Sequence, residues 1–319
     1  MSSQRNLIVR NRFRPQVEDL EGRWVPTVMV TPGGGSLTLT GMNNQAHNIQ
    51  IMDDGKGDVS VTADGVSSSF TGISSISIKG GNKADTVFYQ LTGPVTQGVN
   101  VSADLRGGNN AFIALVQKDI QAGGSVNFMV QNSSGTGRDA VAVNVLGGVA
   151  SGGSLGVLVN PSNGGGASES VNLVGNKTIA GTVMIDLEGT SKNDLESVNI
   201  SDNIDTTGFV LVTERGKPGN DTETINFSGQ DKGTLVLQAD GGPGADTINI
   251  QANLATGSSG AVIASEMGGP GNDHLTLALR KQTGDNPSLS GNVDGGPGND
   301  TAMVTPGVTT TNVEHPTMI

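Results

Sequence analysis

The six residues GGPGAD at 241–246 decide the fold, because two close copies, both GGPGND, follow at 268–273 and 295–300. The final aspartates of the three copies are 27 residues apart. Weaker copies occur upstream at intervals of 25 to 30 residues. We predict that the final residues form one column: Asp58, Asp85, Asn110, Asp139, Glu169, Asp194, Asp221, Asp246, Asp273 and Asp300. A repeat of this length is typical of solenoids, propellers and similar arrays.

Alternating apolar and polar residues flank the motif, as in TLVLQAD at 234–240 and HLTLAL at 274–279. This alternation, bounded by Gly, Pro, Asn and Asp, indicates short strands. A repeat this short cannot bury its apolar side chains alone, so the repeats have to stack. We therefore predict an all-β protein, a right-handed parallel β-helix or solenoid of about ten coils of about 27 residues. An antiparallel array of hairpins is the alternative, although the turns are too irregular for two-residue hairpins.

Composition and charge exclude several classes of protein. The 319 residues include 49 glycines but only 3% aromatic residues, which argues against a compact layered core. The 18 basic and 30 acidic residues give a net charge of -12, which disfavours a nucleic-acid partner. No apolar run is long enough to predict a transmembrane segment. The absence of cysteine excludes disulfides and thiolate chemistry.

The N-terminal residues 1–23 differ from the repeats, because they carry a net charge of +2. After Pro15, the side chains of Val17, Leu20 and Trp24 have helical spacing, which predicts a short helix that caps the solenoid. The expected domains are a basic, sorting-like segment with the cap helix (1–23), the solenoid (24–304) and a C-terminal tail or edge cover (305–319).

The stretch RFRPQVEDLEGRWVP at 12–26 resembles an N-terminal motif, P-x-V-E-x-L-E-x-R, of surface and secreted proteins of planctomycete bacteria. The matching positions are Pro15, Val17, Glu18, Leu20, Glu21 and Arg23. This resemblance implies export to the cell surface or the extracellular space. A plain helical cap is the alternative role for the same residues, and the two roles are compatible.

The motif GGPGND also resembles the calcium-binding nonapeptide of hemolysin-type proteins, G-G-x-G-x-D-x-U-x, where U is a large aliphatic residue. In that family the nonapeptides run in tandem, two to a coil, and loops on both sides share each ion. Here one motif occurs in each 27 residues, so only the chemical logic carries over. By that logic the candidate metal ligands are Asp194, Asp221, Asp246, Asp273, Asp300, Asp240 and Asp294.

Stacking the aspartates in register would place neighbouring carboxylates ~4.8 Å apart and cost about 3.5 kcal/mol per pair at an effective dielectric of about 20. Bound Ca²⁺ would relieve this repulsion, because it prefers carboxylate and carbonyl oxygens. Hydrogen bonds from the amides of each aspartate's own turn would relieve it without a metal. The sequence leaves both explanations open.

The sequence favours a non-enzymatic, exported structural or adhesive solenoid, with glycans, envelope components or further copies of the chain as partners. A calcium-dependent binding module is the first alternative. The second is a polysaccharide-cleaving enzyme of the pectin-lyase type, for which Arg106, Arg138 and Arg215 lie near the repeat corners. Short loops, with only Trp24 and Tyr89 as large polar aromatics, argue against catalysis. We therefore predict no catalytic residues and no cofactor other than Ca²⁺.

Overall fold

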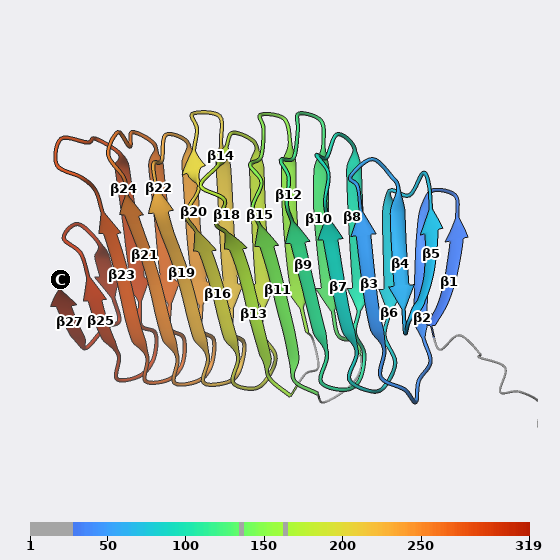
Figure 1. The fold of residues 1–319 in the computed structure, drawn as a ribbon. Coiled ribbons are helices and arrows are strands. Elements are labelled where there is room, and N and C mark those ends of the chain that lie inside the picture. Colours follow the sequence, from blue (N-terminus) through green and yellow to red (C-terminus); the bar gives the residue numbers. More distant parts are fainter. Residues whose placement is uncertain (1–27, 134–136, 162–164) are drawn as a thin grey trace, which may run out of the picture.

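The computed structural model describes residues 28–133, 137–161 and 165–319. Two long sheets run along the whole solenoid (Figure 1), and their buried side chains form one common core. Successive coils contribute strands to each sheet in turn. Sheet A contains, in spatial order, β1 (Val28–Gly33), β2 (Ser36–Gly41), β6 (Ser75–Lys79), β8 (Gly98–Asp104), β10 (Ser125–Gln131), β12 (Ser154–Asn160), β15 (Thr182–Glu188), β18 (Phe209–Arg215), β20 (Thr234–Asp240), β22 (Ala261–Met267), β24 (Ser288–Asp294) and β26 (Thr309–Thr311).

Sheet B contains, in spatial order, β27 (His315–Met318), β25 (Thr301–Val304), β23 (His274–Arg280), β21 (Thr247–Leu254), β19 (Thr222–Gly229), β16 (Leu195–Ile200), β13 (Ala167–Leu173), β11 (Asp139–Val145), β9 (Ala111–Val116), β7 (Thr86–Leu91), β3 (Asn48–Asp53), β4 (Val59–Ala63) and β5 (Val66–Phe70). A small third sheet pairs β14 (Thr178–Ile179) with β17 (Asn203–Ile204). From β6 to β26 and from β7 to β27, neighbouring strands of sheets A and B are parallel. The predicted parallel solenoid is therefore confirmed.

The number of turns is smaller than predicted. Strand register joins Asp85 to Asp300 through eight turns of 25 to 29 residues, not about ten. Asp58 does not belong to the column, because it precedes β4 in an antiparallel hairpin. Glu169 was also misplaced, because Ala167 occupies the column position in that coil and Glu169 lies two residues further along β13.

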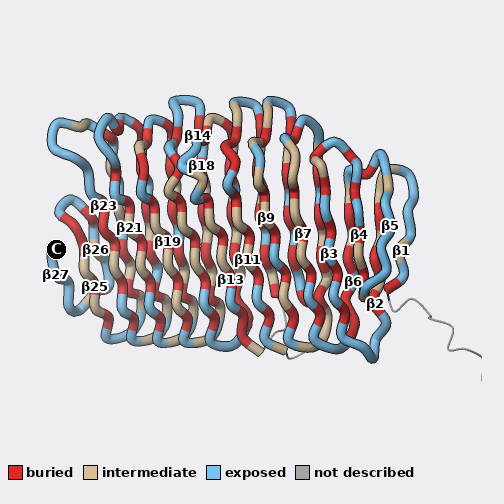
Figure 2. The backbone as a smooth tube through the Cα atoms, viewed as in Figure 1, coloured by how far each residue is buried: buried red, intermediate tan, exposed pale blue. Residues whose placement is uncertain are grey.

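The core follows from the alternation in the sequence. Along most strands every second side chain is buried, and Figure 2 shows the same alternation along the whole rod. The buried side chains are mainly Val, Ile and Leu, which suit a narrow interior. The bulkiest fully buried residues are Tyr89, Phe112, Phe128 and Phe227.

The two ends of the solenoid are built differently. At the N-terminal end, the antiparallel pairs β1–β2 and β3–β4–β5 close the sheets, and β5 is an exposed, serine-rich edge. At the C-terminal end, β26 and β27 continue both sheets with short strands. The helix predicted near Pro15 lies outside the described residues, and the described ranges contain no helix. Accordingly, they hold no helix long and apolar enough to cross a membrane.

Candidate functional site

The five aspartates predicted to stack do lie in one column at a corner of the solenoid. Register aligns each with the next, and each directly precedes a strand of sheet B. The aspartates are Asp194, Asp221, Asp246, Asp273 and Asp300, which precede β16, β19, β21, β23 and β25. We refer to them, with the residues in register at the other coils, as the corner column.

A chain of hydrogen bonds links the corner column. The backbone N–H of Asp246 donates to Oδ1 of Asp273 at 2.9 Å, and that of Asp273 donates to Oδ1 of Asp300 at 2.8 Å. The N–H of Asp300 donates in turn to Oε2 of Glu314 at 2.8 Å, which ends the chain. One of the two explanations left open by the sequence placed the donors in each aspartate's own turn. From Asp221 to Asp300 the donors to Oδ1 come instead from the preceding coil, because stacking brings its amide against the carboxylate.

The glycines of the motif are explained by the same packing. A Cβ on Gly268 would lie 2.5 Å from Oδ2 of Asp273, so the first glycine makes room for the carboxylate. A Cβ on Gly271 would lie 1.4 Å from the carbonyl oxygen of Gly244, so the fourth position admits only glycine. Gly269 has φ +91°, which side chains rarely adopt. GGPGND is therefore a packing requirement of this corner.

The second carboxylate oxygen has no partner in most of the column. The Oδ2 atoms are buried and make no hydrogen bond in Asp221, Asp246, Asp273 and Asp300. Burial raises the pKa of Asp221 and Asp246 to about 7 and that of Asp273 to about 6. In Asp194, by contrast, Oδ2 accepts from the Thr190 N–H at 2.6 Å.

The fit to calcium is partial. Buried, unpartnered carboxylate oxygens are the hard donors that Ca²⁺ prefers. However, no three acidic or histidine side chains in the described ranges are arranged to hold a metal ion. Asp240 and Asp294 end strands of sheet A, where their Oδ1 atoms accept from the N–H groups of Gly242 and Gly296 at 3.2 Å.

A second set of carboxylates points into the core, and of these only Glu169 was singled out from the sequence, where it was assigned to the corner column. We call it the interior cluster: Glu169, Glu196 and Glu223 on sheet B, with Glu214 on sheet A. All four are at most 1% exposed. Neither carboxylate oxygen of Glu169 or Glu196 has a hydrogen-bond partner, whereas Oε1 of Glu223 accepts from the Gly216 N–H at 2.7 Å. The signal was present, because ASESVNL, LESVNI and TETINF place glutamate at the alternate positions that elsewhere hold Val or Ile.

The interior cluster is surrounded by apolar groups and by its own members. Burial raises the pKa of Glu214 to about 8. Burial first, and neighbouring carboxylates second, raise the pKa of Glu169, Glu196 and Glu223 well above the usual value. The nearby cation is Lys217, which is paired with Glu188 at 3.2 Å on the outer surface. Burial therefore favours the neutral form of every member of the interior cluster.

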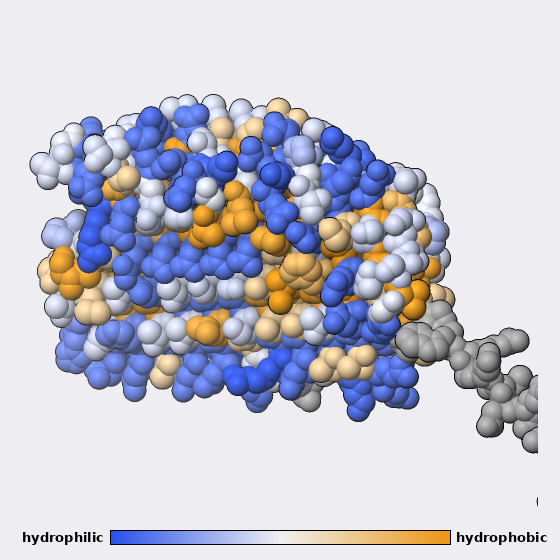
Figure 3. All heavy atoms as spheres, viewed as in Figure 1, coloured by the Kyte–Doolittle hydropathy of each residue, from blue (hydrophilic) through white to orange (hydrophobic). Residues whose placement is uncertain are grey.

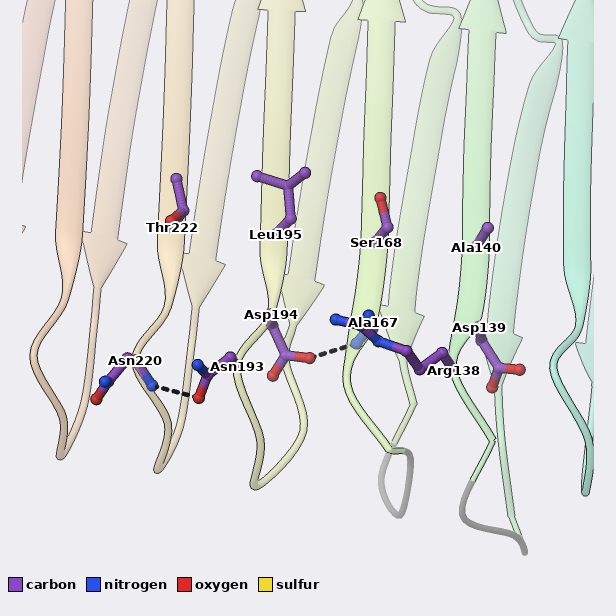
Figure 4. Close-up of a pocket in the computed structure, with 10 residues that line it drawn as sticks. All are labelled: Arg138, Asp139, Ala140, Ala167, Ser168, Asn193, Asp194, Leu195, Asn220 and Thr222. Carbon is purple, nitrogen blue, oxygen red and sulfur yellow. Dashed lines mark hydrogen bonds between the residues drawn. The ribbon is translucent and has the colours of Figure 1, made fainter.

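A depression of about 430 Å³ opens beside the corner column (Figure 4). Its lining includes Ala167, which occupies the column position in its coil and has no side-chain oxygen. Figure 4 shows the side chain of Arg138 extending toward Ala167. Among the described residues, Arg138 forms no ion pair and its guanidinium makes no hydrogen bond. By contrast, Arg215 is paired with Asp186 on the outside of sheet A.

The two carboxylates that border the depression are already engaged. Oδ1 of Asp139 accepts from both the N–H and the Nδ2 of Asn110, and its Oδ2 accepts from Asn132. Oδ1 of Asp194 accepts from the N–H of Ala167 at 2.5 Å. Acid–base catalysis needs a carboxyl within reach of a substrate proton. These two act instead as acceptors that hold the corner together.

The outer face of sheet B carries a ladder of asparagines. The Nδ2 of Asn172 donates to Oδ1 of Asn144 at 3.1 Å, and Asn199 and Asn226 repeat the bond in the next coils at 3.0 and 3.1 Å. Beside this ladder runs a row of small hydroxyl residues, Ser170, Ser197 and Thr224. Figure 3 shows hydrophilic and intermediate residues gathered in such rows along this face.

Comparison with known protein families, with curated proteins and with solved structures found no match to the chain.

Proposed function

We propose that the protein is an exported, non-enzymatic structural or adhesive solenoid of the cell surface. The observation that carries this proposal is the ordered polar face of sheet B, where the asparagine ladder from Asn144 to Asn226 continues through four coils. The proposal of export rests on the resemblance of residues 12–26 to surface-protein N-termini.

The geometry of this face suits a partner that is itself repetitive. Amides and hydroxyls recur every ~4.8 Å along the rod, the spacing of adjacent strands. A polysaccharide or a second copy of the chain presents polar groups at regular intervals, so many weak contacts can form together and add up in avidity. The net charge of -12 favours neutral or cation-bridged partners over phosphate backbones.

Co-sedimentation with insoluble chitin and cellulose tests the proposal, and light scattering tests self-association. The double variant Asn172→Lys, Asn199→Lys should reduce the retained fraction about tenfold, because it disrupts contacts that act together. The matched control, Ser102→Lys with Ser265→Lys, changes the outer face of sheet A and should bind normally. The proposal fails if the wild-type protein binds neither polysaccharide and remains monomeric, or if both double variants bind as the wild type does.

A calcium-dependent binding module is the second candidate, favoured by the unpartnered Oδ2 atoms of the corner column. If Ca²⁺ binds there only in the folded state, millimolar Ca²⁺ should raise the midpoint of thermal unfolding by more than about 5 °C over EDTA. Mg²⁺ at the same concentration is the control, because it needs stricter octahedral geometry. Equal midpoints in all three buffers would remove this candidate.

A further inference from the structure

His47 is a buried histidine at the N-terminal end of the solenoid, and both of its ring nitrogens face oxygen acceptors. Nδ1 lies 2.9 Å from Oδ2 of Asp64, and Nε2 lies 3.0 Å from the carbonyl oxygen of Met42. A neutral imidazole has one N–H and one lone pair, so it can donate to only one of these oxygens. The protonated ring has two N–H groups and satisfies both. The geometry therefore fits the imidazolium form.

The surroundings of the ring are closely fitted and acidic. The His47 side chain has no exposed surface, and a Cβ on Gly41 would lie 2.5 Å from its Cδ2, so glycine makes room for the ring. The charged groups that act on the ring are Asp64 and Asp85, and Oδ1 of Asp85 accepts the backbone N–H of His47 at 2.9 Å. Burial lowers the pKa of His47, but the hydrogen bonds to Asp64 and Met42, with the charges of the two aspartates, raise it above the usual 6.5.

The ring joins three parts of this end of the molecule. Met42 follows β2 of sheet A, and His47 directly precedes β3 of sheet B. Asp64 lies in the turn of the β4–β5 hairpin and has φ +48°. The backbone N–H of Asp64 donates to the carbonyl oxygen of Asn48 at 2.9 Å, and its Oδ1 accepts the N–H of Asn48 at 2.8 Å. The side chain of Asp64 therefore connects the turn of the hairpin both to the ring and to the start of β3.

The β4–β5 hairpin closes sheet B at this end. It covers the edge of β3, and its strand β4 contributes Val61 and Ala63 to the core. If the ring were neutral, one nitrogen would present its lone pair to an oxygen, either at Met42 or at Asp64. The contact that holds the turn of the hairpin would then be weakened.

We propose that His47 is a pH-dependent latch, which holds the turn of the β4–β5 hairpin against the solenoid when protonated and releases it when deprotonated. The folded state binds this proton more tightly than the unfolded state does, because the pKa of His47 is raised. The stabilisation is therefore fully present below about pH 6.5 and is lost as the pH rises through the pKa of the folded protein. Release would expose backbone groups at the edge of β3. The latch is independent of the polar face of sheet B.

The first test is an NMR titration of the histidine rings of the full chain from pH 5 to 9, with His274→Gln and His315→Gln to assign the signals. His47 should titrate above pH 6.5. Asp64→Asn keeps an oxygen for the Asn48 N–H but removes the charge, so it should lower the midpoint of His47. The proposal is overturned if His47 titrates at or below pH 6.5, keeps one protonation state from pH 5 to 9, or has the same midpoint in Asp64→Asn.

The second test measures release of the turn by hydrogen exchange at pH 6 and pH 8.5, corrected for the intrinsic effect of pH. The amides of Asn48 and Asp64 report on the turn, and those of β11, in the middle of the array, are the internal control. The turn amides should exchange at least about tenfold faster at pH 8.5 relative to β11, because a charge-assisted hydrogen bond is lost.

Two variants assign that change to the ring. In His47→Gln, the difference between the two pH values should disappear. In Asp64→Asn, which serves if the glutamine variant does not fold, the onset of faster exchange should move to lower pH together with the titration of the ring. Equal exchange at both pH values in the wild type, or an unchanged pH dependence in the variants, would overturn the proposal.

Discussion

Asp221 and Glu223 are two residues apart in the same coil, yet they represent two different uses of a carboxylate. Asp221 lies at the corner, where Oδ1 accepts the N–H of Asp194 at 2.7 Å. Glu223 points inward, and with Glu196 and Glu214 it faces other acids and apolar side chains. The corner column is a series of acceptors that the backbone requires, whereas the interior cluster has almost no donors to satisfy it.

The difference shows that position in the coil decides what an acidic residue contributes. At the corner, one carboxylate oxygen accepts a backbone N–H that has no carbonyl partner in the strand ladder. The side chain therefore stabilises the stacking of the coils. In the interior, the same group is tolerated only when it is protonated, because a buried charge without a partner is costly. Substitutions in the corner column should therefore change the free energy of unfolding mainly through the shape of the side chain. The interior cluster should make the free energy of unfolding depend on pH.

The largest expected effect is a loss of stability at alkaline pH. Glu214 has a pKa of about 8 in the folded protein and an ordinary pKa of 4.5 when unfolded, so the folded state holds the proton more tightly. Its contribution is fully present below about pH 4.5 and is lost as the pH rises through about 8. Glu214 alone should then lower the free energy of unfolding by about 5 kcal/mol between pH 4.5 and 9. Urea unfolding at pH 5, 7 and 9 measures this change.

The control for the pH experiment is Glu214→Gln, which keeps the shape of the protonated acid. It should leave stability at pH 5 nearly unchanged and flatten part of the decline toward pH 9. A wild-type protein that is as stable at pH 9 as at pH 5 would contradict the assignment of neutral acids. Stability at pH 9 that depends on added Ca²⁺ would instead indicate a cation among the glutamates.

The next largest effect is expected at the corner, from Gly271→Ala. The new Cβ would lie 1.4 Å from the carbonyl oxygen of Gly244, and only movement of the backbone could relieve the clash. We expect a loss of about 3 kcal/mol in the free energy of unfolding. Gly98→Ala is the control, because its nearest contact is an ordinary 3.4 Å to the Ser125 hydroxyl. Equal losses in the two variants would show that the stacked turns are not tightly packed.

A smaller loss is expected from Asp246→Ala, which leaves the N–H of Asp221 without its acceptor. Removing a buried acceptor of this kind costs about 1 to 3 kcal/mol. The loss should be smaller at pH 8 than at pH 5, because alanine also removes a buried carboxyl whose pKa is about 7 and whose charge is disfavoured above that pH. Thermal unfolding at the two pH values distinguishes this outcome from a loss that appears only when the carboxyl is ionised.

The sequence was sufficient for the fold and for most of the corner. The 27-residue spacing of Asp246, Asp273 and Asp300 aligns with the strand register because each coil adds a nearly constant length. Glu169 was misassigned, because a single coil with alanine in the column shifts the nearest acid by two residues, and spacing alone cannot detect this. The hydrogen bonds to the preceding coil also escaped prediction, since they depend on which amide the stacking brings close to each carboxylate.

The opening beside Ala167 and the interior cluster have the same origin. Both arise from side chains that break the repeat, an alanine where aspartate is usual and glutamates where aliphatic residues are usual. Residues that differ from the repeat consensus are not detected when only recurring residues are aligned. In a solenoid whose coils are otherwise alike, the exceptional residues are where a specific site can form.

The smallest expected effect separates shape from charge in the corner column. Asn110 already occupies one position, where its Oδ1 accepts the N–H of Asp85 at 2.9 Å, so an amide can serve as the acceptor. Asp246→Asn should therefore change the free energy of unfolding by less than about 0.5 kcal/mol below about pH 4, where the carboxyl is largely neutral in both states, the usual limit for a substitution that keeps its contacts. At pH 8 it should be more stable than the wild type, because burial disfavours the charge of Asp246, whose pKa is about 7. A loss comparable to that of Asp246→Ala would mean that the negative charge itself is needed, which is the result expected if a cation binds to the column.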